Sequence, residues 1–159
     1  MLDSVALAPQ GIAFFTAAVF VDSLRYKFTD HPKTQEIFGR LDAWAGRNGF
    51  FGLFGPTGVF GQYVIGTAEL LASCLLLLGA FCAPYRFFLP LGAGIAFLVM
   101  SGAIAFHLFT PLGIDPNRDG GGLFRAACAV WLGSLLLLIL RADALALLGE
   151  RLGAFAAPA

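Results

Sequence analysis

The sequence predicts an all-α membrane protein, and two observations carry that prediction. Hydrophobic residues make up 58% of the 159 residues, whereas charged residues make up only 13%, about half the roughly 25% that is usual in soluble domains. The apolar residues gather in four segments, each close to the length of about 20 residues that a helix needs to cross a bilayer. We therefore expect an antiparallel bundle of four transmembrane helices, forming a single integral membrane domain over residues 1–159.

The four predicted spans lie at about 9–28, 58–82, 87–109 and 123–140. Residues 4–21 contain no charged side chain, and the first span has no Lys/Arg-rich stretch before it, so we expect a span rather than a cleaved signal peptide. Glu69 alone interrupts the second span and His107 alone interrupts the third; Arg125 lies near the start of the fourth. The tail ADALALLGERLGAF is a candidate for a surface helix.

A short amphipathic helix is predicted between the first two spans, at about 32–45. The apolar residues of this segment share one helical face: Ile37, Phe38, Leu41, Trp44 and Ala45. Pro32 suits a first helical turn, Asp30 can cap it, and Gly46 can end it. We expect this helix to lie at the membrane surface, with Trp44 among the headgroups.

The basic residues favour one orientation in the membrane. Seven lie at the face of the first and third loops and three at the other face: Arg25, Lys27, Lys33, Arg40, Arg47, Arg118 and Arg125, against Arg86, Arg141 and Arg151. The excess predicts cytoplasmic loops one and three, although only five remain against three if Arg25 and Arg125 point into the bundle. Lys+Arg and Asp+Glu balance at ten each, which gives no indication of a nucleic-acid partner.

Polar residues from all four spans converge at the end of the bundle that carries loops one and three. They are Asp22 and Arg25 on the first span, Gln62 and Tyr63 on the second, His107 on the third and Arg125 on the fourth. Glu69 is placed deeper, about 20 Å from Pro56 at 1.5 Å per residue, near the midplane. We therefore expect a polar vestibule that His107 faces and that has Glu69 as its floor, about 13 Å further in.

Each of these residues has a structural alternative. A carboxyl in mid-membrane is costly, so Glu69 is a candidate proton-handling or ligand-binding group, or a neutral side chain that is hydrogen-bonded to a neighbouring helix. His107 could instead reach interfacial water from its helix end. Asp22 and Arg25 have the i, i+3 spacing of a structural ion pair.

Few of the remaining motifs indicate a cofactor. Asp115, Asn117 and Asp119 resemble the start of a calcium loop, but its twelfth position is Ala126 instead of glutamate, and these residues are ordinary turn formers. No zinc spacing, haem pattern or iron–sulfur pattern occurs, so we expect no metal. The three cysteines, Cys74, Cys82 and Cys128, have the sequence context of inert buried thiols.

Taken in order, YKFTDHPKTQEIF, FGQYVIGTAELLASCLLLLG and VMSGAIAFHLFTPLG resemble the DoxX-like family of small four-helix membrane proteins. The matching residues are Lys27, Phe28 and Thr29 after the first span, Gly66 and Glu69 in the second, and His107 in the third. The resemblance covers roughly residues 10–140. It implies the four-helix fold and a link to redox complexes, thiosulfate:quinone oxidoreduction or oxidative-stress resistance, while distant relatives assist the assembly of other membrane proteins.

These observations lead to an expected function with two alternatives. We expect a subunit of the bacterial cytoplasmic membrane that binds a quinone-like molecule or relays protons for a redox partner. Glu69 and His107 would be its hydrogen-bonding groups, and Tyr63 with phenylalanine-rich walls would hold the ring. The alternatives are a non-catalytic assembly or scaffold subunit and a small-solute transporter, which four spans could form only as an oligomer. Whether the chain is itself an enzyme stays open.

The predicted orientation can be tested by cysteine labelling in intact cells at engineered positions 35 and 117. Both positions should resist a membrane-impermeant reagent, because the basic residues place these loops in the cytoplasm. Labelling at both positions would show that the orientation is reversed.

Overall fold

The structure, a computed structural model, describes residues 2–118 and 120–142. This part of the chain is all helical, which confirms the predicted fold class. Its helices are α1 (Leu2–Lys27), α2 (Pro32–Arg47), α3 (Gln62–Phe81), α4 (Phe88–Phe109) and α5 (Gly122–Leu140), with a short 3-10 helix at Ala83–Tyr85. The candidate tail helix, residues 142–155, lies outside the described residues apart from Ala142.

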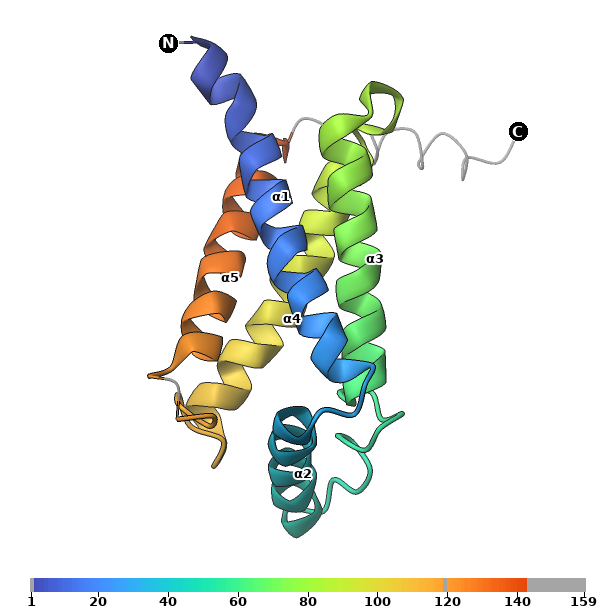
Figure 1. The fold of residues 1–159 in the computed structure, drawn as a ribbon, viewed down its shortest axis with the longest axis vertical. Coiled ribbons are helices and arrows are strands. Elements are labelled where there is room, and N and C mark those ends of the chain that lie inside the picture. The colour runs from blue at the N-terminus through green and yellow to red at the C-terminus, as the bar shows by residue number, and fades with distance from the viewer. Residues whose placement is uncertain (1, 119, 143–159) are drawn as a thin grey trace, which may run out of the picture.

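Four of these helices, α1, α3, α4 and α5, are long and apolar enough to cross a membrane. They run alternately up and down, so the bundle is antiparallel as predicted (Figure 1). The two longer connections, 28–61 and 110–121, lie at the same end of the bundle as α2. We call this the loop end; the N-terminal turns of α1 lie at the other end (Figure 1).

Glycines allow close helix contacts in the half of the bundle away from the loop end. A Cβ atom at Gly79 of α3 would lie 2.2 Å from the backbone nitrogen of Leu89, and one at Gly92 of α4 would lie 2.8 Å from that of Leu76. On α5, a Cβ at Gly133 would lie 3.0 Å from a methyl group of Ile12. Small residues let helix backbones approach closely in membranes, so this half of the bundle is tightly closed.

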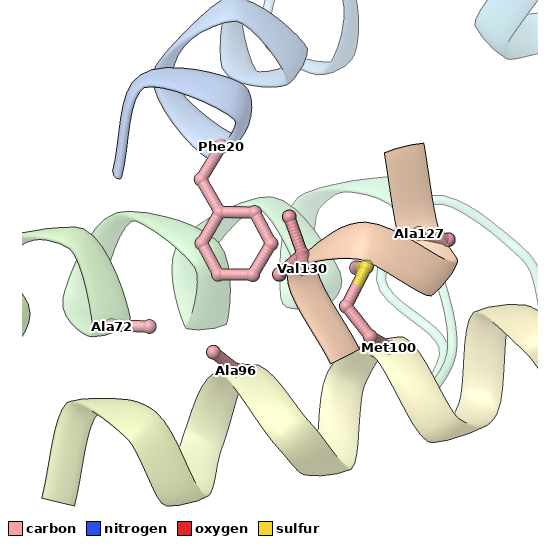
Figure 2. Packing of buried hydrophobic residues seen from close by; sticks show 6 residues of the cluster. All are labelled: Phe20, Ala72, Ala96, Met100, Ala127 and Val130. Carbon is pink, nitrogen blue, oxygen red and sulfur yellow. The ribbon is translucent and has the colours of Figure 1, made fainter. Parts of the chain in front are cut away.

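In the middle of the bundle, all four spans contribute residues to one buried apolar cluster, which we call the mid-level cluster. Its members are Phe20, Ala72, Ala96, Met100, Ala127 and Val130. The alanines on α3 and α4 leave room for the ring of Phe20 between the helices (Figure 2). Interdigitation of large and small side chains fills the space at this level, and this cluster is the boundary between the closed half and the loop end.

The helix between the first two spans begins at Pro32 as predicted, but the predicted N-cap, Asp30, and the predicted end at Gly46 are wrong. His31 is the N-cap, and its Nδ1 accepts a hydrogen bond of 3.2 Å from the backbone nitrogen of Lys33. Asp30 is unsuited to cap the helix because it adopts a left-handed conformation, with φ of 52°. Helix α2 also continues past Gly46 to Arg47, and the turn is made by Gly49, with φ of 85°.

The apolar face of α2 packs on other parts of the protein at the loop end. Leu41 and Ala45 belong to a buried cluster with Phe54 and Leu112, and partly buried aromatic rings pack around it, including Phe106 from α4. Phe106 lies 4.9 Å from Phe54, ring centre to ring centre, in an edge-on contact. Helix α2 therefore covers the loop end of the bundle (Figure 1).

The second span is shorter than predicted because it begins at Gln62 and not at Gly58. Residues 51–61 form turns that fold back on one another. A Cβ at Gly61 would lie 2.0 Å from the carbonyl oxygen of Gly55, so only glycine permits this approach. The turns put Phe54 and Phe60 under α2.

Packing of α2 predicts that Trp44 is shielded from aqueous fluorescence quenchers. Trp44 is half-buried against the Leu41–Phe54 cluster, and the measurement needs a Trp131→Phe background because the other tryptophan lies within α5. Phe54→Ala, which removes the surface that α2 packs on, should increase quenching of Trp44 several-fold. Equal and free quenching with and without this substitution would show that α2 is not held against the bundle.

Candidate functional site

A cavity of about 640 Å³ lies at the loop end of the bundle. Its inner end is formed by Phe20, Met100 and Ala127 of the mid-level cluster, and its outer end by Leu41, Phe54, Phe60, Phe106 and Leu112 beneath α2. Most of the lining is apolar, and the polar residues in it include Ser23, Lys27, Glu69 and His107. The volume falls within the range of small-molecule sites, roughly 300–1,000 Å³.

An ion pair between Lys27 and Glu69 forms one wall of this cavity. The Nζ atom of Lys27 lies 3.0 Å from both carboxylate oxygens of Glu69. The side chain of Glu69 is only 3% exposed and that of Lys27 14%. Because a buried carboxylate is costly unless it is paired and hydrogen-bonded, Lys27 compensates Glu69. The alternative drawn from the sequence, a neutral Glu69 that is hydrogen-bonded to a neighbouring helix, did not include Lys27 as its partner.

Lys27 keeps one N–H for a ligand. The two carboxylate oxygens of Glu69 lie next to each other, so one ammonium hydrogen points between them, and a second is donated to the hydroxyl of Ser23, one helical turn earlier on α1. A lysine ammonium has three donors. Ser23, which accepts from Lys27, also hydrogen-bonds to Glu69 and lines the cavity. The groups open to a ligand on this wall are therefore the third ammonium hydrogen of Lys27, which lines the cavity, and the remaining lone pairs of Glu69.

Gly66 makes the approach of Lys27 to Glu69 possible. A Cβ at Gly66 would lie 3.2 Å from the ring of Phe28 and 3.5 Å from Cδ of Lys27. A larger side chain would push the end of α1 away from α3. The Gly-x-x-Glu element of α3 thus provides both the space for the lysine and the carboxylate that it pairs with.

A second polar cluster, centred on Asp30, fastens the first loop to α3. One carboxylate oxygen of Asp30 accepts hydrogen bonds from the Gln62 amide at 2.5 Å, the Tyr63 hydroxyl at 2.7 Å and the Gln35 amide at 3.2 Å. Gln35 of α2 also donates to the amide oxygen of Gln62 at 2.8 Å. This cluster holds the start of α2 against the start of α3. Neither Gln62 nor Tyr63 lines the cavity.

His107 is buried at the loop end of α4 and lines the cavity. Its Nδ1 lies 2.6 Å from the carbonyl oxygen of Gly113, to which it donates, and its ring contacts Phe124 edge-on at 5.5 Å. The bond to Gly113 leaves Nε2 as the second functional atom. No residue that the structure describes hydrogen-bonds to Nε2.

The remaining predicted site residues lie toward the outside. Asp22 and Arg25 form an ion pair of 2.8 Å whose side chains are 60% and 66% exposed, and only Asp22 touches the cavity. Arg125 is exposed and not part of the cavity lining. The expected convergence therefore holds for Glu69, His107 and Asp22 but not for the arginines, which extend away from the bundle axis.

The predicted depth of Glu69 is too large. The prediction assumes a helix from Pro56 onward, whereas α3 begins only at Gln62. Glu69 therefore lies seven residues, about 10 Å, from the start of α3. His107 lies two residues, about 3 Å, from the end of α4. The offset along the bundle shrinks from about 13 Å to about 7 Å, and both residues line one cavity.

Sequence reasoning missed Ser23, Lys27 and Asp30 as site residues. A signal existed for the first two, because they are four residues apart on the last turns of an otherwise apolar helix, where they share a face. Only the family resemblance and the count of basic residues pointed to Lys27. Asp30 gave no comparable signal, because its role depends on a left-handed backbone conformation.

No metal centre is found among residues 2–118 and 120–142, in which no three His, Cys, Asp or Glu side chains are grouped to hold an ion. Asp115 and Asn117 lie in the turn before α5, and Asp119 lies outside the described residues. Comparison of the chain with protein-family models, with curated proteins and with solved structures gave no match. The site is therefore interpreted from its own geometry.

The Lys27–Glu69 pair predicts unequal effects of its two single substitutions on stability. Lys27→Met leaves a buried carboxylate without a counter-charge and should lower the free energy of unfolding by roughly 3 kcal/mol. Glu69→Leu should cost less, because Lys27 is the last residue of α1 and can extend its ammonium toward the interface. The double variant should regain most of the stability, since apolar residues replace a buried pair well.

Reversible unfolding in mixed detergent micelles, analysed as a double-mutant cycle, measures these effects. Asp22→Asn is the control, because an exposed ion pair contributes little. Two equal single losses that simply add in the double variant would contradict a coupled buried pair.

Proposed function

We propose that this chain is a DoxX-like membrane subunit that binds a quinone-like molecule in the loop-end cavity. The observation that supports the proposal is the cavity itself: about 640 Å³, mostly apolar, with Ser23, Glu69 and His107 in its walls. A large apolar pocket with a few polar groups is the usual form of a site for an apolar ring with polar substituents. Tyr63, expected to hold the ring, is instead bound to Asp30 and is replaced in this role by Phe60 and Phe106.

The polar groups suit the oxygens of a quinone. The N–H of Lys27 that is used neither for Glu69 nor for Ser23 can donate a hydrogen bond to a carbonyl oxygen, and Nε2 of His107, whose Nδ1 donates to Gly113, can accept one from a hydroxyl group of a reduced ring. Glu69 can accept the hydrogen of a reduced, hydroxyl-bearing ring. Oxidation of such a reduced quinone releases two electrons and two protons, and this proposal assigns the protons to the Glu69 carboxylate and to Nε2 of His107 and the electrons to a partner subunit.

The same proposal includes the cellular setting. We place the chain in the bacterial cytoplasmic membrane, with the loop end on the cytoplasmic side, because seven of the ten basic residues lie at that end. The bound molecule would come from the bilayer, and the redox partner would be another subunit of a membrane complex or a second copy of the chain.

Filling the cavity should abolish binding. Ala103 lines the cavity on α4, and Ala103→Phe would occupy the space of the ring; Ala105→Phe, on the same helix but not in the cavity lining, is the matched control. We expect purified wild-type protein and Ala105→Phe to retain quinone in lipid extracts and to bind a decyl-tailed ubiquinone analogue in lipid nanodiscs. Ala103→Phe should lose at least tenfold in affinity, as expected when a ring loses its buried contacts.

The outcome that would contradict the proposal is equal binding by all three proteins, or binding by none. Thermal unfolding of each variant shows whether the fold is retained. Purification of stoichiometric partner protein with no bound quinone would favour the scaffold alternative.

A further inference from the structure

The four spans separate into two pairs at the loop end. Helices α1 and α3 stay together through the Lys27–Glu69 pair, and α4 and α5 stay together through the contact of His107 with Phe124. In Figure 1 the lower ends of α1 and α3 lie on one side and those of α4 and α5 on the other. The cavity occupies the space between the pairs, because all four helices contribute to its lining.

The way into the cavity along the bundle axis is covered. Leu41 of α2, Phe54 and Leu112 are buried and form the outer end of the cavity, with Phe106 packed against them. The hydrogen bond that the Gln35 side-chain amide donates to the amide oxygen of Gln62 holds α2 in this position. A molecule reaching the cavity from the aqueous side would have to separate this cluster.

The side between α3 and α4 is open and apolar. Val64 of α3 and Leu98 of α4 both line the cavity, yet they are 42% and 69% exposed. On α3, Gly66 and Glu69 face α1, so Val64 and Ala68 lie toward the opposite edge of the helix. On α4, Leu98 and Gly102 are four residues apart and share the face of the helix that is turned away from the buried Met100 and His107. The cavity therefore reaches the lipid-facing surface between these two helices.

Small residues keep this opening wide. A Cβ at Gly102 of α4 would meet only the ring edge of Phe106, at 3.9 Å, and the small Ala68 of α3 also lines the cavity. The glycines at which α3 and α4 approach closely, Gly79 and Gly92, lie in the far half of the bundle. An alkyl or isoprenoid chain passing here would touch only apolar side chains.

The opposite side, between α1 and α5, is less suited to an apolar chain. Asp22 lines the cavity there and forms an exposed ion pair with Arg25. A hydrocarbon chain laid over this pair would remove charged groups from water, which is unfavourable. The two sides of the cavity thus differ in polarity.

From these observations we infer that the ligand is a long-tailed amphiphile taken from the bilayer, with its head in the cavity and its tail leaving between α3 and α4, past Val64 and Leu98. The inference rests on the proposed function and adds the ligand class and its route. A water-soluble ligand of similar head chemistry would need no such opening.

Two quinones with the same head test the inference in nanodiscs: the decyl-tailed ubiquinone analogue and its tailless 2,3-dimethoxy-5-methyl counterpart. Gly102→Leu should block the opening, and Gly94→Leu is the matched control, because Gly94 has open space beyond its Cα but is not part of the cavity lining. We expect Gly102→Leu to weaken binding of the tailed probe about tenfold, equivalent to the contacts of two methylene groups. Binding of the tailless probe should change less than twofold.

The possible failures can be distinguished. If wild-type protein binds neither probe, the proposed function is wrong and the inference fails with it. If both probes bind but Gly102→Leu weakens them equally or not at all, the route is wrong while the proposed function stands.

A photoreactive diazirine at the tail end of the decyl probe gives a second measurement, which needs no substitution. Mass spectrometry should find labelled residues at 64–68 and 95–102. Labelling at 22–26 and 122–126 would overturn the inference by placing the tail between α1 and α5.

Discussion

The structure depends on the burial of one carboxylate among apolar helices. Glu69 cannot lie 3% exposed in an ionised form unless a counter-charge reaches it, and the lysine that does so is the last residue of α1. This requirement fixes where α1 ends relative to α3, and Gly66 provides the space. Once these two helices are held together at the loop end, the other pair can diverge from them and a cavity can remain between the pairs.

Much of the fold could be predicted because bilayer physics leaves few choices. Apolar segments of about 20 residues are expected to be helical in lipid, because only a helix forms all backbone hydrogen bonds within one segment. Helix α2 was also predictable, because its apolar residues repeat with helical spacing. Its ends were not, because the choice between Asp30 and His31 as N-cap depends on a left-handed residue that the sequence does not reveal.

The candidate site was predictable in part. Glu69 and His107 are conspicuous because they are polar residues in apolar helices, and both line the cavity. Lys27 was harder to identify, because a lysine at a helix end usually extends toward the interface; here its ammonium is held inside by Glu69 and Ser23. The turns at residues 51–61 caused the error in depth, since glycine-mediated chain reversals add residues without adding helical rise.

The cluster that covers the loop end has a consequence for biogenesis. Leu41 in α2 and Leu112 after α4 belong to one buried cluster, although they are 71 residues apart in the chain. At a synthesis rate of about 5–20 residues per second, the ribosome makes Leu112 roughly 4–14 seconds after Leu41. During that interval the apolar face of α2 lacks part of its final covering, so the nascent chain must keep it at the membrane surface or in contact with the insertion machinery. The cap can close only after α4 has been inserted, which makes it one of the last parts of the protein to form.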